Sequence, residues 1–150
     1  KEMRPGRIVL GNVKNGNTKI PKKNPLWESL SPKQFEALKA EIIATHGVLD
    51  REHPLYDKNI AISLFLDSMS EADFWYCVAL CGGNMKTSVS KKLDFLVEGH
   101  DKSGKYIKGQ TGKSREARDL NQGGLANISI IDEPELLKIL GPAILGQIDK

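Results

Sequence analysis

Short apolar runs alternate with helix-forming segments between residues 59 and 140, and this alternation limits the possible folds more than any other feature of the 150-residue chain. Four runs have the apolar and β-branched character of buried strands, at 59–66, 86–89, 93–97 and 128–131. Helix-length connections of this kind join parallel strands and cover both faces of the sheet. The sequence therefore predicts an α/β fold, with a small, mainly parallel, four-stranded sheet and helices on both faces.

Start and stop signals support the helices of this pattern. The expected helices lie near 70–81, 113–121 and 133–140. Ser70 and Asp132 are side chains that cap helix N-termini, and each is placed directly before its helix. Gly82-Gly83 and Gly141-Pro142 are stop signals at the other ends. The caps and stops predict the same boundaries as the apolar pattern.

A further helix is expected ahead of the alternating region. Ser31 can cap it, Pro32 suits its first position, and Gln34 completes a capping box. Its apolar face is expected to pack on the following domain and consists of Phe35, Leu38, Ile42 and Ile43. The predicted organisation is a basic arm or linker over 1–30, this helix and a connector over 31–55, one domain over 56–141, and a tail over 142–150.

The net charge of +3 is distributed unevenly along the chain. Residues 1–25 hold seven basic side chains and one acidic side chain, a net charge of +6, so the remaining residues sum to −3. A basic arm can contact phosphate or an acidic partner, or it can be a solvated tail, and the sequence leaves both interpretations open. Because the chain begins with Lys1, we expect it to be a piece of a larger protein.

The residue patterns that mark catalytic, metal and membrane proteins are missing from the sequence. Cys77 and Cys81 are expected to be buried thiols, because a zinc site needs two more ligands and the three histidines show no ligand spacing. Segment 109–114 departs from a P-loop in the spacing of its glycines. No apolar run approaches the ~20 residues that span a bilayer. We therefore expect a non-catalytic intracellular protein with no metal, cofactor or membrane contact, cytoplasmic if bacterial and nuclear if eukaryotic.

Several motifs within 56–141 resemble those of a BRCT domain. The matching segments are 53–56, 58–63, 67–70, Gly82-Gly83, 88–92, 94–99, 112–114 with Ala117, and 130–133. The chain is most similar to the BRCT modules that follow the exonuclease domain in some bacterial relatives of the DNA polymerase III proofreading subunit. This resemblance implies a four-stranded parallel sheet with two helices on one side and one on the other, in agreement with the residue pattern. The chain departs from the family in Leu64, which replaces a glycine, and in a last helix without tryptophan.

The resemblance also implies a phosphate site. Phosphate-binding BRCT domains use a hydroxyl, the backbone amide that follows it, and a lysine at the start of their second helix. These positions fall on Ser63, Leu64 and Lys113, with Thr111 and Gly112 beside the lysine. A helix N-terminus supplies unpaired N–H groups and a positive dipole end for such a phosphate. In the alternative interpretation, Ser63 satisfies a local hydrogen bond, Lys113 is solvated, and the Leu64 side chain obstructs the phosphate.

Two functions remain open at this point. BRCT domains of clamp-loader large subunits and NAD-dependent ligases bind 5′-phosphorylated DNA ends, whereas paired BRCT domains bind phosphoserine peptides, and only one such domain fits this length. We expect a non-catalytic module of a DNA replication or repair protein, which binds DNA to position an attached enzyme. The alternative is a phosphate-independent protein–protein interaction module, favoured by the acidic Glu71 and Asp73 at a helix start.

Overall fold

A computed structural model describes residues 28–46, 51–100 and 112–148. The elements, in chain order, are α1 (Pro32–His46), β1 (Asn59–Ser63), α2 (Glu71–Cys81), β2 (Asn84–Met85), β3 (Phe95–Glu98), α3 (Gly112–Gln122), β4 (Ser129–Asp132), α4 (Glu133–Leu145) and the 3₁₀ turn η2 (Gly146–Ile148). Most of the predicted basic arm and also Thr111 lie outside the described residues. No helix in the described part of the chain is long and apolar enough to cross a membrane.

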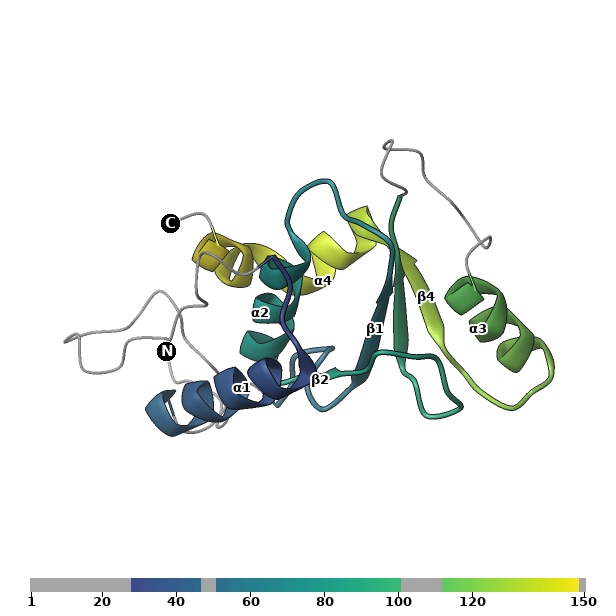
Figure 1. The fold of residues 1–150 in the computed structure, drawn as a ribbon, viewed down its shortest axis with the longest axis horizontal. Helices are drawn as coiled ribbons and strands as arrows, with labels where there is room; N and C mark the ends of the chain where they lie inside the picture. Colours follow the sequence, from purple (N-terminus) through teal and green to yellow (C-terminus); the bar gives the residue numbers. More distant parts are fainter. Residues whose placement is uncertain (1–27, 47–50, 101–111, 149–150) are drawn as a thin grey trace.

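The four strands form one parallel sheet in the order β2-β1-β3-β4. Helices α1, α2 and α4 lie on one side of the sheet, and α3 lies on the other (Figure 1). The predicted α/β architecture is therefore confirmed, with helices on both faces. The strand order and the two-plus-one arrangement of α2, α4 and α3 are consistent with BRCT-like topology.

Side chains alternate between two hydrophobic cores along the central strands. Ile60 and Ile62 of β1 pack with Val97 of β3 under α2 and α4. Ala61, between the two isoleucines, and Leu96 pack on the opposite face under α3. A strand that is buried on both faces needs an unbroken apolar run, because successive side chains point to opposite sides. This explains why 60–62 and 95–97 are continuous apolar segments.

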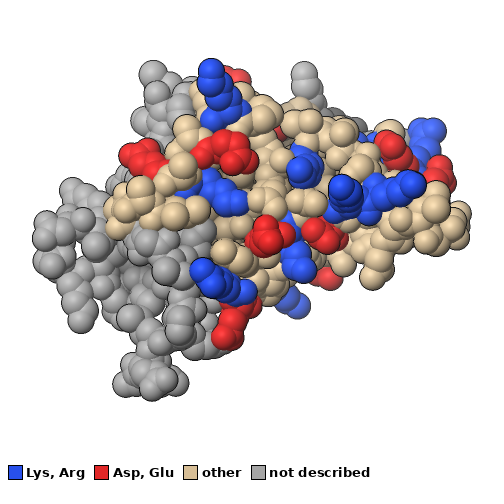
Figure 2. All heavy atoms as spheres, turned by 90° about the horizontal axis from the view of Figure 1, so that it is seen from below, with Lys and Arg blue, Asp and Glu red and all other residues tan. Residues whose placement is uncertain are grey.

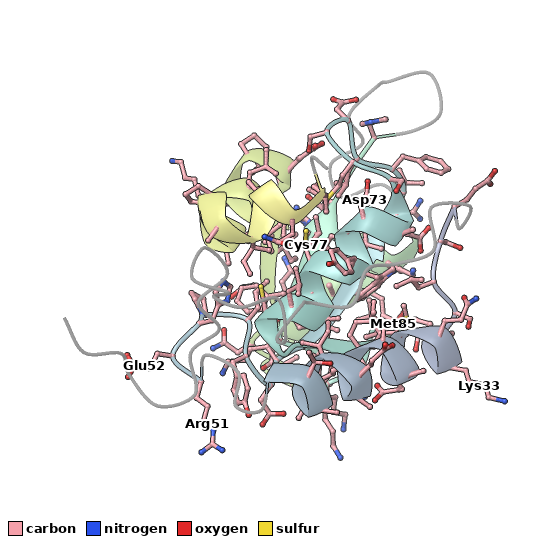
Figure 3. All side chains as sticks on the ribbon, turned by 90° about the vertical axis from the view of Figure 1, so that its left-hand side faces the viewer. Lys33, Arg51, Glu52, Asp73, Cys77 and Met85 are labelled. Atoms are coloured by element: carbon pink, nitrogen blue, oxygen red, sulfur yellow. The ribbon has the colours of Figure 1, made fainter. Side chains whose placement is uncertain are left out.

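Helix α1 packs on the same core and lies alongside α2 (Figure 3). Phe35 is fully buried, and its ring meets that of Trp75 edge-on, with the centroids 5.8 Å apart. The Lys39 ammonium donates a hydrogen bond to the Asn84 side chain of β2 across 2.8 Å. The predicted inward face is correct for three of its four residues, but Ile43 is 42% exposed. Helix α1 is thus part of the hydrophobic core, although it precedes the segment that resembles a BRCT domain.

The predicted caps are present in the structure. Ser31 and Gln34 exchange side-chain to backbone hydrogen bonds of 2.8 and 3.1 Å, as a capping box requires. Ser70 Oγ accepts from the amide of Asp73, and the Asp132 carboxylate accepts from the amide of Glu135. Local side-chain chemistry therefore determines where α1, α2 and α4 begin.

Two predicted strands have different boundaries in the structure. The first strand ends at Ser63 rather than at residue 66, because Leu64 adopts a left-handed backbone with φ of 70°. The strand predicted at 86–89 lies earlier, at β2, where the Asn84 amide bonds to the carbonyl of Lys58. Val89 is buried in the α3-side core from a loop instead.

The last helix also differs from the prediction. Gly141 takes a non-helical conformation with φ of 83°, as a stop signal should, but helical structure resumes after it and continues to Leu145. Pro142 can begin a new helical turn because the first position of a helix needs no N–H donor. Ile144 is buried, so the added turn folds back onto the core. The predicted tail is therefore partly helical.

We predict that Phe35→Ala lowers the free energy of unfolding by about 3–5 kcal/mol, because it empties a fully buried aromatic site. Urea denaturation of both forms measures the change. Lys33→Ala, an exposed substitution on the same helix, is the control and should have little effect. Equal stability of the two variants would contradict the packing of α1 on the core.

Candidate functional site

The predicted phosphate-site residues meet at the carboxyl end of β1. Ser63 is the last residue of this strand and is 4% exposed. The half-buried Lys113, in the first turn of α3, donates from Nζ to the carbonyl oxygen of Ile62 across 3.0 Å. The structure therefore brings Ser63, Leu64 and Lys113 together, and Gly112 begins the helix beside them. The remaining predicted residue, Thr111, lies outside the described residues.

Leu64 adopts the backbone conformation of a glycine. Its φ of 70° lies in the left-handed region, which costs an L-residue about 1–2 kcal/mol. Backbone pairing resumes directly after Leu64, because Phe65 and His100 exchange hydrogen bonds of 3.0 and 2.8 Å. The turn after β1 thus has a backbone conformation that glycine adopts readily, with a leucine side chain added to it.

A hollow of about 230 Å³ lies beside Lys113. We call it the lysine pocket, and its lining residues are Leu30, Ile62, Glu71, Trp75, Met85, Lys86, Thr87 and Lys113. One wall is apolar and comes from α2 and the segment before α1, whereas the charged groups lie around the rest. Glu71 stands at the first position of α2, and its carboxylate accepts a hydrogen bond from Trp75 Nε1 across 3.3 Å. The pocket combines two cations with one fixed anion.

A buried ion pair links α3 to the sheet next to Ser63. Glu98 is the register partner of Ser63 on β3 and is only 2% exposed. Arg118 reaches it with both guanidinium nitrogens, at 2.9 and 3.5 Å. This pair fixes the orientation of α3, and the Glu98 carboxylate balances the positive charge of Arg118. The sequence does not indicate this ion pair, because Glu98 stands at the end of an apolar run and its partner lies 20 residues away.

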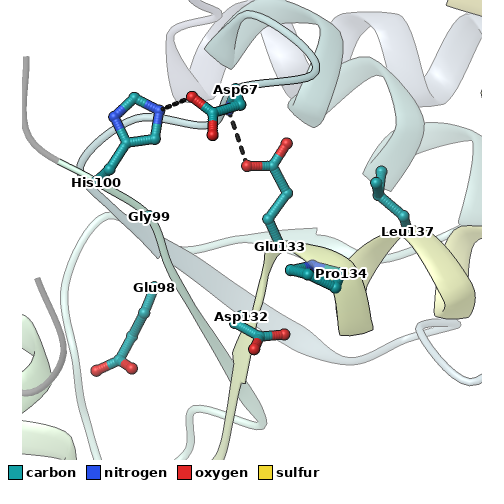
Figure 4. Close-up of a pocket in the computed structure, with 8 residues that line it drawn as sticks. All are labelled: Asp67, Glu98, Gly99, His100, Asp132, Glu133, Pro134 and Leu137. Atoms are coloured by element: carbon teal, nitrogen blue, oxygen red, sulfur yellow. Dashed lines mark hydrogen bonds and ion pairs between the residues drawn. The ribbon is translucent and has the colours of Figure 1, made fainter. Parts of the chain in front are cut away.

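A second hollow, of about 420 Å³, lies at the start of α4 (Figure 4). It is rich in carboxylates, but these groups already bind protein. Glu133 accepts hydrogen bonds from the amides of Asp67 and Ser68, at 2.8 and 2.7 Å, and from the Ser68 hydroxyl. Asp67 in turn contacts His100 Nε2 at 2.7 Å. These contacts hold the loop after β1 against α4, so we assign this cluster a structural role.

The two cysteines are both buried, as predicted. Burial, with a smaller contribution from Asp73, raises the pKa of the Cys77 thiol to about 12, so it stays protonated. The fold places His53 Nε2 3.5 Å from Cys81 Sγ, a proximity that the sequence spacing did not indicate. His53 Nδ1 accepts from the Leu55 amide, which leaves Nε2 to carry the proton of the neutral ring. His53 therefore faces the thiol as a donor rather than as a base.

No group of three or more histidine, cysteine or carboxylate side chains that could hold a metal ion occurs among the described residues.

Comparison with known proteins gives one relative. A DNA ligase from Chlamydia caviae is 33% identical over 85 residues, which cover 57% of this chain and 11% of the ligase. The chain thus spans about a tenth of the length of that relative. No protein-family model matches the chain.

The contacts of Glu133 predict how the stability of the fold depends on pH. Burial alone would raise the pKa of Glu133, but the hydrogen bonds from Ser68 and Asp67 and the nearby His100 lower it below 4.5. A carboxyl whose pKa is lowered by folding stabilises the fold above its unfolded pKa and loses that contribution as the pH falls through the folded value. We therefore expect the free energy of unfolding to decline below about pH 4.5, and to decline less steeply in Glu133→Gln.

Urea denaturation at a series of pH values between neutral and acidic conditions measures this effect. Glu135→Gln, an exposed substitution two residues along the same helix, is the matched control and should keep the decline of the natural protein. If Glu133→Gln and the natural protein lose stability in parallel, the contacts of Glu133 with the loop after β1 do not stabilise the fold.

Proposed function

We propose that this chain is a non-catalytic module of the BRCT type from a protein of DNA metabolism, and that it binds a 5′-phosphorylated DNA end to position an attached enzyme. The observation that carries the proposal is the meeting of Ser63, the left-handed Leu64 and Lys113 at the carboxyl end of β1. The fold and the similarity to a DNA ligase support the same assignment.

The groups at the carboxyl end of β1 and the start of α3 can bind an anion. Helix α3 begins there with no acidic residue in its first turn, so its unpaired N–H groups and its dipole present positive charge. Lys113 donates one hydrogen bond to the carbonyl of Ile62 and makes no other hydrogen bond or ion pair within residues 28–46, 51–100 and 112–148, so its ammonium has further N–H donors for a phosphate there. A terminal phosphate monoester carries a charge of about −1.5 to −2 near neutral pH, so it gains more from this environment than a neutral ligand does.

The face of the molecule that Figure 2 presents does not have the basic surface expected of a protein that binds along a duplex. On the face that Figure 2 presents, lysine and arginine side chains are interspersed with aspartate and glutamate. Proteins that bind DNA along its backbone gather basic side chains on one face, which neutralise many phosphates. The mixed face seen here does not provide such a surface. A single phosphate held in one corner requires only a few local groups.

Phosphate-independent protein binding is the second candidate function. The Leu64 side chain extends from the turn where the family has only glycine, and Phe65 beside it is 44% exposed. Exposed apolar side chains at one edge are a common feature of docking surfaces. The acidic Glu71 at the start of α2 also weakens an anion site. These features would serve a protein partner equally well.

The test is a fluorescence-anisotropy titration of a labelled duplex, with and without a 5′-phosphate, at low ionic strength. We expect tighter binding of the phosphorylated duplex, and we expect Lys113→Ala to remove about 1.5–3 kcal/mol of that preference, the contribution of a charged hydrogen bond. Lys138→Ala removes the same charge from an exposed position on α4 and should preserve the preference.

Equal binding of the two duplexes by the natural protein would contradict the DNA-end proposal and favour the protein-docking function. The same conclusion would follow if Lys113→Ala and Lys138→Ala weakened binding equally, because the phosphate would then be attracted only by overall charge.

A further inference from the structure

The lysine pocket contains a second cation that the phosphate site of the resemblance does not include. Lys86 follows β2 directly, and its backbone amide donates to the carbonyl of Ile60 across 2.8 Å. Its position is therefore fixed by β1, the strand that also carries Ser63. The Lys86 side chain is exposed, and no hydrogen bond or ion pair engages its ammonium within the described part of the chain. It is available to a ligand in the pocket.

We propose that Lys86 is a phosphate-binding residue that acts with Lys113 to make the pocket selective for a terminal phosphate over an internal phosphodiester, and that the carboxylate of Glu71 limits how strongly the pocket attracts either group. This inference rests on the proposed function and extends it to two residues. The ligand class is a phosphate monoester at the 5′ end of DNA.

Charge determines the selectivity. Lys113 and Glu71 line the same pocket and offset one another, so with these two groups alone the pocket would present no net charge. Lys86 restores a net charge of one positive unit. An internal phosphodiester carries a single negative charge, so the net positive charge of the pocket attracts it less strongly than a more highly charged group. A terminal monoester carries about −1.5 to −2 and offers three acceptor oxygens, so it can engage both lysines despite the carboxylate.

A hydrogen bond holds the Glu71 carboxylate in the lysine pocket, where it repels an anionic ligand. The indole Nε1 of Trp75 donates to the Glu71 carboxylate, and Trp75 itself is 2% exposed and packed against Phe35 and Phe74. A carboxylate that accepts a hydrogen bond from a side chain packed in the core has fewer positions available than a carboxylate without such a bond. The same packing provides the apolar wall of the pocket. Thr87 adds a neutral hydroxyl to the lining.

The experiment measures binding of the 5′-phosphorylated and the hydroxyl-ended duplex to Lys86→Ala, Lys86→Arg and Glu71→Gln. We expect Lys86→Ala to reduce the preference for the phosphorylated duplex about tenfold, and Lys86→Arg to retain most of it. Glu71→Gln should strengthen binding of both duplexes severalfold, and the phosphorylated duplex more, because the carboxylate repels the more highly charged terminal phosphate more strongly. Circular dichroism confirms that each variant is folded.

Lys91→Ala is the matched control, because it removes an exposed lysine from the loop that follows Thr87 without changing the lining of the pocket. Its preference should equal that of the natural protein. A preference lost in Lys113→Ala but unchanged in both Lys86→Ala and Glu71→Gln would overturn the role of the pocket and leave the proposed function standing.

Another result would separate the proposed function from the role of the pocket residues. If the natural protein does not prefer the phosphorylated duplex but Glu71→Gln does, the pocket is an anion site that Glu71 closes, and the proposed function fails while the role of Glu71 stands. Displacement of the duplex by a phosphoserine peptide that binds more tightly would overturn the assignment of DNA as the ligand.

Discussion

The central strands β1 and β3 are buried on both faces, and the positions of the other elements follow from this constraint. Burial of apolar side chains on two faces requires two covering layers, which α2 and α4 provide on one side and α3 on the other. The carboxyl ends of parallel strands then lie at one edge, together with the start of the helix that follows β3. This is why Ser63 and Lys113, fifty residues apart, meet without any direct sequence signal.

The sequence predicted what depends on local chemistry and periodicity. The apolar runs predicted the strands of the sheet. Ser70 and Asp132 predicted where two helices begin, because a capping side chain bonds to a backbone amide within three residues of it. The end of β1 was missed because residues 64–66 are apolar, and only the backbone conformation of Leu64 reveals the turn. Residues Glu98 and Arg118 could not be paired in advance, since their contact depends on how α3 docks on β3.

The proposed site combines a turn after β1 that has a glycine-like backbone conformation with Lys113 in the first turn of α3. Two acidic groups, Glu71 in the lysine pocket and Glu98 beside Ser63, reduce the positive charge around them, and Arg118 balances only Glu98. A site with so little excess charge favours one strongly charged group over a long, uniformly charged backbone. This balance connects the fold to the preference for phosphorylated ends that we propose.

The most direct test of the central claim is an amide chemical-shift titration of the ¹⁵N-labelled protein with a 5′-phosphorylated duplex and with its hydroxyl-ended counterpart. The account predicts that the amides of Leu64, Lys86 and Lys113 shift with the phosphorylated duplex and shift far less with the other. Shifts that are the same for both duplexes, or that leave the amides of Leu64 and Lys113 unmoved, would contradict a phosphate site at the carboxyl end of β1.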